Sequence, residues 1–265
     1  MKKRIICLTM VLILAIGLLA CSKAVKEDEK LNSDEKENVS TEAEIIEGDE
    51  HPYIGTKKAT LKATEEAPEI DGQKDKLYDK VGTKISLDEF NLEYWENKPL
   101  SKSAEVYLTY DKDYLYLYAE VVDDSIDYTG DEVWKRDSLG VILDFNYIRE
   151  KVEYEKYQGD KIGYVNIACN NTHEYYHEYL EEPYASMISY KSRIIERSDS
   201  RYVIEMRLPF IEGFNGGKLG FDVTNTDCIN GDRCGVRTWN IDGSQMYKYT
   251  HCTGTLEFEE NLWEK

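Results

Sequence analysis

Residues 104–122 read AEVYLTYDKDYLYLYAEVV, and this stretch decides the fold class. In residues 114–122, small and aliphatic side chains alternate with tyrosines and a glutamate, which is the period of two that a half-buried β-strand shows. Residues 104–110 form a second run of β-forming residues, and the polar residues 111–113 between the two runs favour a turn. The stretch therefore predicts a β-hairpin.

Similar short runs occur along the chain, separated by clusters of turn residues, and helical periodicity is nearly absent. We expect further strands at residues 138–145, 163–168, 187–196, 201–208, 219–226, 235–241 and 253–259. Short strands at this spacing are typical of an all-β antiparallel β-sandwich. Residues 59–265 are long enough for one such domain.

The N-terminus has the pattern of an export signal. Residues 1–20 begin with Lys2-Lys3-Arg4 and continue into a short apolar run, as in a secretory signal peptide. The sequence Leu18-Leu19-Ala20-Cys21 resembles the lipobox of bacterial lipoproteins, which implies a lipidated Cys21. The alternative is an ordinary cleaved signal in which Cys21 has no special role. The polar residues that follow, up to residue 58, predict a disordered acidic stalk. We therefore expect an extracytoplasmic protein of the bacterial cell envelope, attached to the membrane by lipid.

The strong negative charge of the chain limits the classes of partner that we expect it to bind. Loss of residues 1–20 removes three of the 33 basic residues and moves the formal net charge from −19 to −22. Such a charge argues against nucleic acid and against direct contact with an anionic membrane surface, which leaves the lipid as the only membrane contact. It favours neutral ligands, cations or metal ions.

Trp134 is a candidate ligand-binding residue, because it lies between an acidic loop and the strand predicted at residues 138–145. A sugar ring has a face of C–H groups and a rim of hydroxyls, so an aromatic ring flanked by polar side chains can hold it. The competing interpretation places Trp134 in the core, where most tryptophans are largely buried.

The order of motifs resembles a family 9 carbohydrate-binding module, within the wider group of DOMON-like sandwich domains. The resemblance covers about residues 66–259 and rests on Ile70-Asp71-Gly72, the hairpin Val106–Val122, Trp134-x-x-Asp137-Ser138, residues 202–209, 220–223, 227–239 and 254–256. It implies a jelly-roll-like β-sandwich that binds carbohydrate without catalysis. The chain departs from the family at Gly140, where an acidic residue is common, and at Tyr78, where a tryptophan is common.

In the family, two tryptophans clamp a terminal sugar while polar side chains contact its hydroxyls. The resemblance implies a clamp of Trp134 and Trp239, with Arg136, Asp137, Arg237 and Asn240 near the rim. We expect capture of oligosaccharide or polysaccharide at the cell surface, beside glycoside hydrolases or sugar transporters.

Family members also carry structural calcium, and here Asp123, Asp124, Asp131 and Glu132 offer the oxygen ligands that calcium requires. The alternative is a solvated acidic loop in an acidic protein. In addition, the cysteines Cys169, Cys228, Cys234 and Cys252 allow three disulfide pairings in an exported protein. A bridge between Cys228 and Cys234 is favoured because these residues flank a predicted hairpin tip.

Two other functions have some support in the sequence. His173-Glu174-Tyr175-Tyr176-His177 matches the His-Glu-x-x-His pattern of zinc-dependent hydrolases, although Pro183 leaves room for only a short helix. A haem-binding DOMON-like domain is the other possibility, with Met206 or Met246 and a histidine as axial ligands.

Overall fold

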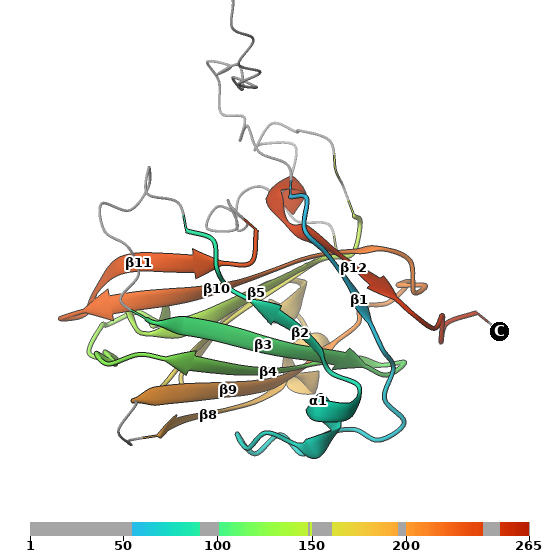
Figure 1. Cartoon of the computed structure of the whole chain (residues 1–265). Coiled ribbons are helices and arrows are strands. Elements are labelled where there is room, and N and C mark those ends of the chain that lie inside the picture. Colours follow the sequence, from blue (N-terminus) through green and yellow to red (C-terminus); the bar gives the residue numbers. More distant parts are fainter. Residues whose placement is uncertain are drawn as a thin grey trace, which may run out of the picture. The chain divides into compact units, whose positions relative to one another are not determined.

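The computed structural model describes residues 55–90, 101–147, 149, 161–195, 200–240 and 250–264. These residues form two β-sheets that pack face to face, which confirms the predicted β-sandwich (Figure 1). Within the described residues, one sheet has seven strands, in the order β1-β12-β10-β5-β6-β7 with β11 also paired to β10. The other has five strands, in the order β2-β3-β4-β9-β8.

The strands are bounded as follows: β1 Lys58–Leu61, β2 Thr83–Ser86, β3 Ser103–Tyr110, β4 Tyr114–Val122, β5 Ser138–Asp144, β6 Ile162–Ala168, β7 His173–His177, β8 Ser189–Ile195, β9 Arg201–Pro209, β10 Leu219–Ile229, β11 Asp232–Thr238 and β12 Gly254–Phe258. The helices are α1 Lys76–Lys80, α2 Tyr184–Met187 and the short 3₁₀ turns Val133–Lys135, Glu178–Leu180 and Thr250–Cys252. Within the described part of the chain, no helix is both long enough and apolar enough to cross a membrane.

The predicted hairpin is present as β3 and β4, which pair from Ser103↔Val122 to Tyr110↔Leu115. Asp111 fixes the turn, because its Oδ1 accepts hydrogen bonds of 2.8 Å from the backbone N–H groups of Asp113 and Tyr114. The aliphatic side chains of β4 point between the sheets, where each fully buried leucine contributes about 1.5–3 kcal/mol.

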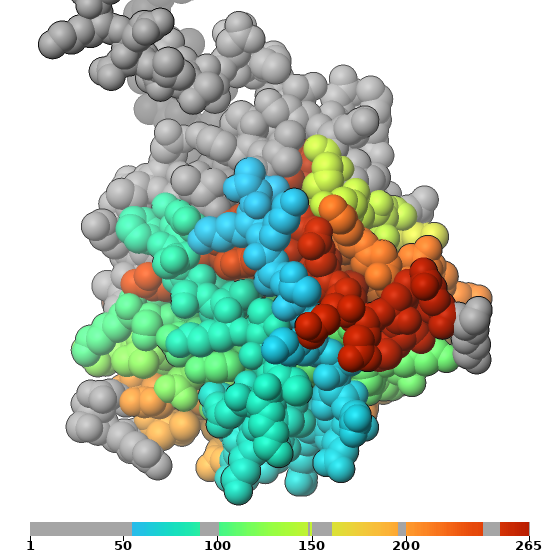
Figure 2. All heavy atoms as spheres, turned by 45° about the vertical axis from the view of Figure 1, so that its right-hand side comes forward, coloured from blue at the N-terminus to red at the C-terminus, as the bar shows by residue number. Residues whose placement is uncertain are grey.

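Strand β1 closes the seven-stranded sheet by pairing in parallel with β12, from Lys58↔Thr255 to Leu61↔Phe258. Figure 2 shows the blue β1 segment and the red C-terminal segment side by side on the surface. Neither β1 nor β2 was predicted from the sequence. Both are only four residues long, so they offer little periodicity to detect.

Glu205 of β9 holds the backbone of Asp71 and Gly72 in place. Its Oε2 accepts hydrogen bonds from the backbone N–H groups of Asp71 (3.1 Å) and Gly72 (2.9 Å), and its side chain is buried. Gly72 has φ +76°, a conformation that a side chain would strain. Burial raises the pKa of Glu205 to about 7, so the neutral carboxyl is favoured in the folded protein below about pH 7.

We predict that Glu205→Gln reduces the pH dependence of stability. Because the folded-state pKa of Glu205 lies above that of the unfolded chain, its contribution is fully present below about pH 4.5 and is lost as the pH rises through about 7. Between pH 5 and pH 8, the free energy of unfolding of the variant should rise relative to that of the parent by about 1–3 kcal/mol. Urea unfolding at both pH values measures this, with the exposed Glu212→Gln as control. Parallel pH profiles for the parent and Glu205→Gln would contradict the prediction.

Candidate functional site

A pocket of about 450 Å³ opens on the face of the seven-stranded sheet that points away from the five-stranded sheet. Its volume lies in the usual range for small-molecule sites. The lining residues are Trp134, Tyr164, Asn166, Tyr176, His177 and Arg233.

Strands β6 and β7 provide most of the pocket wall through their alternation. Val165 of β6 and Tyr175 of β7 pack toward the core, so the neighbouring side chains point to the outer face. The register pairs Tyr164 with Tyr176, and their rings stack with centroids 4.9 Å apart and planes inclined by 22°. Tyr176 also donates a hydrogen bond to Glu174, and burial raises the pKa of Tyr176, which keeps the phenol neutral.

The floor of the pocket is polar and uncharged. Asn166 is only 3% exposed, and its Oδ1 has no hydrogen-bond partner within the described part of the chain. A Cβ atom added to Gly140 would lie 2.7 Å from Thr224 Oγ1 and 3.4 Å from both Asn166 Oδ1 and the Tyr164 hydroxyl. Gly140 therefore keeps open a space that three neutral polar groups surround.

Trp134 borders the pocket at the 3₁₀ turn Val133–Lys135, and its side chain is 37% exposed. The loop that carries it is held by Arg136, whose Nε donates to the Gly130 carbonyl and whose Nη1 donates to Thr172 Oγ1, both at 2.7 Å. Glu174 accepts a further hydrogen bond from the Val133 N–H, at 3.3 Å. The indole is thus exposed on a loop that β7 and the β6–β7 turn hold in place.

His177 and Arg233 add hydrogen-bonding groups to the pocket. His177 ends β7 with φ +57°, and burial lowers its pKa, so its imidazole is neutral near pH 7. Arg233 lies at the start of β11, immediately after the hairpin tip. The pocket therefore combines aromatic faces with neutral hydrogen-bonding groups and one guanidinium.

The predicted tryptophan clamp is wrong in one of its members. Trp239 is 4% exposed and packs in the core, with its ring centroid 5.8 Å from that of Phe221. Gly254 lies so close to the indole that an added Cβ would be 2.6 Å from Cζ3. Trp239 cannot present a face to a ligand in this conformation, whereas Trp134 can.

The predicted rim residues Arg136, Asp137, Arg237 and Asn240 have structural roles, and none of them lines the pocket. Arg237 donates to the carbonyl and hydroxyl oxygens of Ser101. Asn240 is buried and accepts a 3.0 Å hydrogen bond from the Lys57 N–H. Asp137 is also buried.

Four pocket residues were not predicted from the sequence: Tyr164, Asn166, Tyr176 and Arg233. His177 was predicted only as a zinc ligand. A usable signal was present in the alternation Tyr164-Val165-Asn166 of β6. An apolar residue between two polar or aromatic ones indicates an outer face. The equivalent positions of β7 are hidden because no strand was predicted there.

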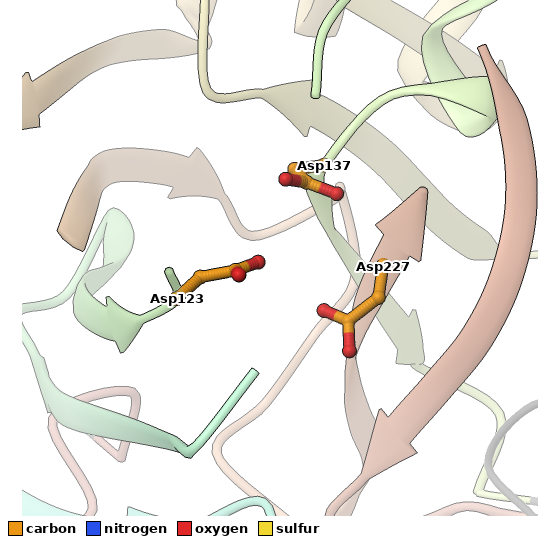
Figure 3. Close-up of side chains that lie close together, drawn as sticks. All are labelled: Asp123, Asp137 and Asp227. Carbon is orange, nitrogen blue, oxygen red and sulfur yellow. The ribbon is translucent and has the colours of Figure 1, made fainter. Parts of the chain in front are cut away.

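Three buried aspartates lie together at one end of the sheets (Figure 3). Asp123 follows β4, Asp137 precedes β5 and Asp227 belongs to β10, and an oxygen of each lies within 4.8 Å of the others. Burial and mutual repulsion raise the pKa of Asp137 to about 8 and that of Asp227 to about 6. Three carboxylates in such a place require protons or a cation to compensate their charge.

The predicted calcium ligands are only partly brought together. Asp123 belongs to the cluster, whereas Asp131 and Glu132 form ion pairs with Lys135 at the surface, at 3.0 and 3.2 Å. The set Asp123–Asp131–Glu132 is therefore wrong, because the loop turns the latter two outward. The aspartate cluster itself offers the hard oxygen ligands that suit calcium.

The His-Glu-x-x-His motif forms strand β7 and no helix, so the zinc hydrolase interpretation is wrong. In a strand, residues four apart are separated by about 13 Å, so His173 and His177 cannot share a metal ion. His173 Nδ1 lies 2.5 Å from the Tyr190 hydroxyl, and His177 lines the pocket.

The described residues also bear on the haem ligand and on the disulfide that the sequence suggested. Met206 is fully buried and packs in the hydrophobic core, which favours a core role over that of a haem ligand, and Met246 lies outside the described residues. Among the described cysteines, Cys228 and Cys234 are free thiols, so the predicted Cys228–Cys234 bridge is absent. A register shift after Asp227 pairs Cys228 with Arg233, and Cys234 Sγ contacts the Asp227 carbonyl at 3.2 Å.

Asp137 anchors the loop that carries Trp134. Its Oδ2 accepts a hydrogen bond from the Asp127 N–H and its Oδ1 accepts one from the Cys228 N–H, both at 2.7 Å. The carboxyl group therefore joins the loop to β10.

We predict that Asp137→Ala lowers the free energy of unfolding by about 2–4 kcal/mol, because two backbone donors lose their acceptor. Urea unfolding at pH 7 measures the loss. Asp131→Ala, on the exposed side of the same loop, should stay within about 0.5 kcal/mol of the parent. Equal stabilities for the two variants would show that Asp137 does not anchor the loop.

Comparison with known proteins assigns the family and the fold. The family model described as carbohydrate family 9 binding domain-like matches residues 70–261. Exoglucanase XynX of Acetivibrio thermocellus is 26% identical over 192 residues, which are 71% of this chain and 16% of that enzyme. Endo-1,4-beta-xylanase A of Thermoanaerobacterium saccharolyticum is 26% identical over 193 residues, 71% of this chain and 15% of that enzyme. The chain thus spans less than a fifth of these relatives.

Solved structures show the same fold. A family 9 carbohydrate-binding module from Caldicellulosiruptor kristjanssonii in complex with glucose has a TM-score of 0.57 and 18% identity, over 79% of this chain and 99% of that one. The module in complex with cellotriose gives 0.56 and 17%, over 77% and 95%. A putative carbohydrate-binding protein from Bacteroides uniformis gives 0.51 and 13%, over 77% and 99%.

Proposed function

We propose that this chain, which belongs to the carbohydrate family 9 binding domain-like family, binds neutral sugars in the pocket beside Trp134. The family model is described as a carbohydrate-binding domain, which supports a role in binding carbohydrate without catalysis. The observation that carries the proposal is the pocket itself, in which an exposed indole and a stacked tyrosine pair border buried polar groups.

The pocket can hold a sugar by two kinds of contact. The C–H face of a pyranose packs on Trp134 or on the Tyr164–Tyr176 pair, and each aromatic contact adds about 1 kcal/mol beyond burial. The hydroxyl rim meets Asn166, His177 and Arg233. Few contacts of this kind give affinities in the millimolar to micromolar range.

Glucans and xylans are the proposed ligands. The two curated relatives are named as an exoglucanase and a xylanase, and the modules of similar fold are named as complexes with cellotriose and glucose. A neutral sugar also suits the strong negative charge of the chain, which would repel an acidic polysaccharide.

We predict that Trp134→Ala weakens binding of cello- or xylo-oligosaccharide by about fivefold to tenfold, because about 1 kcal/mol or more of stacking is lost. Calorimetric titration measures the affinity. Tyr128→Ala is the matched control, since Tyr128 is 48% exposed and does not line the pocket. Parent-like affinity in Trp134→Ala would exclude the indole as a binding surface.

We also propose that a calcium ion occupies the cluster of Asp123, Asp137 and Asp227. The proposal rests on three buried carboxylates whose oxygens converge on one space. A bound ion would compensate their charge and would join the end of β4 to the start of β5 and to β10. It would brace the Trp134 loop and would have no chemical role toward the sugar.

Added calcium should raise the thermal midpoint, and chelator should reverse the rise. At a calcium concentration about 100 times Kd, the expected gain is about 2.7 kcal/mol. Thermal unfolding of Asp227→Asn should lose this response, because a ligand oxygen loses its charge, while Asp131→Asn keeps it. A response in Asp227→Asn equal to that of the parent would place the ion elsewhere.

The proposed location is the outer side of the bacterial membrane. It is supported by the signal pattern of residues 1–20, by Cys21 and by the acidic residues after it, all of which lie outside the described residues. A lipid on Cys21 would hold the sandwich near the surface, where it could deliver oligosaccharides to glycoside hydrolases or sugar transporters.

A further inference from the structure

We infer that Asn166 determines specificity, by accepting a hydrogen bond from one sugar hydroxyl and thereby selecting sugars in which that hydroxyl is free. This inference rests on the proposed function, because it assigns a role within the same pocket. It concerns which sugars the pocket accepts, and its failure can be separated from a failure to bind any sugar.

The first support is the state of the Asn166 side chain. It lines the pocket from β6, where the register places it between Gly140 of β5 and Glu174 of β7. The residue is 3% exposed, yet its Oδ1 has no hydrogen-bond partner among the described residues. Buried acceptors in proteins are nearly always satisfied. A ligand donor would satisfy this one.

The second support is that a neighbouring acceptor is already engaged. Glu174 accepts hydrogen bonds from the Tyr176 hydroxyl and the Val133 N–H. The Glu174 carboxylate therefore holds Tyr176 in the pocket wall, and it also holds the loop that carries Trp134. This leaves Asn166 Oδ1 as the buried acceptor that is open to a ligand among the residues that line the pocket.

The third support is the space through which a ligand can reach Asn166 Oδ1. Gly140 lies directly beside Asn166, and even a methyl group there would stand 3.4 Å from Oδ1 and 2.7 Å from Thr224 Oγ1. The missing side chain at residue 140 leaves room for a ligand hydroxyl above the floor. Gly140 and Asn166 therefore act together, one by leaving space and the other by supplying the acceptor.

The chemistry of the acceptor sets the selection. An amide oxygen accepts hydrogen bonds and cannot donate, so the ligand must supply the hydrogen. A deoxy or O-methyl sugar at the contacting position cannot, and it would leave the acceptor buried without a partner. Sites of this type discriminate strongly against analogues that lack the donor. We expect the loss of that hydroxyl to weaken binding by about tenfold to a hundredfold.

The test combines ligand and protein variants. Parent, Asn166→Asp and Asn166→Leu are titrated with glucose, xylose and their monodeoxy and mono-O-methyl derivatives. The parent should lose affinity tenfold or more at one position only. Asn166→Leu should bind the unmodified sugar more weakly and should no longer distinguish the deoxy derivative. Asn166→Asp keeps an acceptor and should retain the discrimination.

The outcomes separate the two proposals. If neither glucose nor xylose binds the folded parent, the proposed function fails and this inference fails with it. If the sugars bind but Asn166→Leu discriminates as the parent does, or if folded Asn166→Asp loses the discrimination, only the role of Asn166 is overturned. Thermal unfolding monitors folding. Should Asn166→Leu not fold, Gly140→Ala provides the second test, because it should weaken sugar binding by reducing access to Oδ1, and unchanged affinity in this variant would overturn the inference.

Discussion

The buried carboxyl group of Asp137 is the constraint on which the binding face depends. By accepting hydrogen bonds from Asp127 and Cys228, it attaches the loop before β5 to strand β10. That loop carries Trp134 to the edge of the pocket, and Arg136 secures its other side through Gly130 and Thr172. The position of the exposed Trp134 indole therefore depends on polar groups that do not line the pocket.

The two faces of the seven-stranded sheet have different roles. One packs in the core and stabilises the fold, and the other borders the pocket. One face fills the core with aliphatic residues such as Val141 and Val165. The other presents Gly140, Tyr164 and Asn166 to the pocket at the intervening positions. Because alternate residues of one strand serve both purposes, the core that fixes β5 and β6 also fixes the spacing of the pocket groups. No separate scaffold is required for the site.

The sequence predicted the sandwich well, because alternation over long strands such as β4 and β9 is a local property. It predicted the site poorly, because exposure is a property of the assembled fold. Trp134 and Trp239 look alike in sequence, yet only the packing of Phe221 and Gly254 shows which indole is covered. Strand β7 was missed because its five residues match a helical metal motif, and only pairing with β6 reveals its period of two.

The uncharged pocket floor has a consequence for the conditions in which the protein can work. Stacking on aromatic rings and hydrogen bonds to neutral groups depend little on ionic strength, whereas contacts between exposed charges weaken as salt screens them. Sugar capture through Asn166 and the tyrosine pair would therefore tolerate wide changes in salinity. The large negative charge of the chain acts mainly through repulsion between neighbouring copies of the protein.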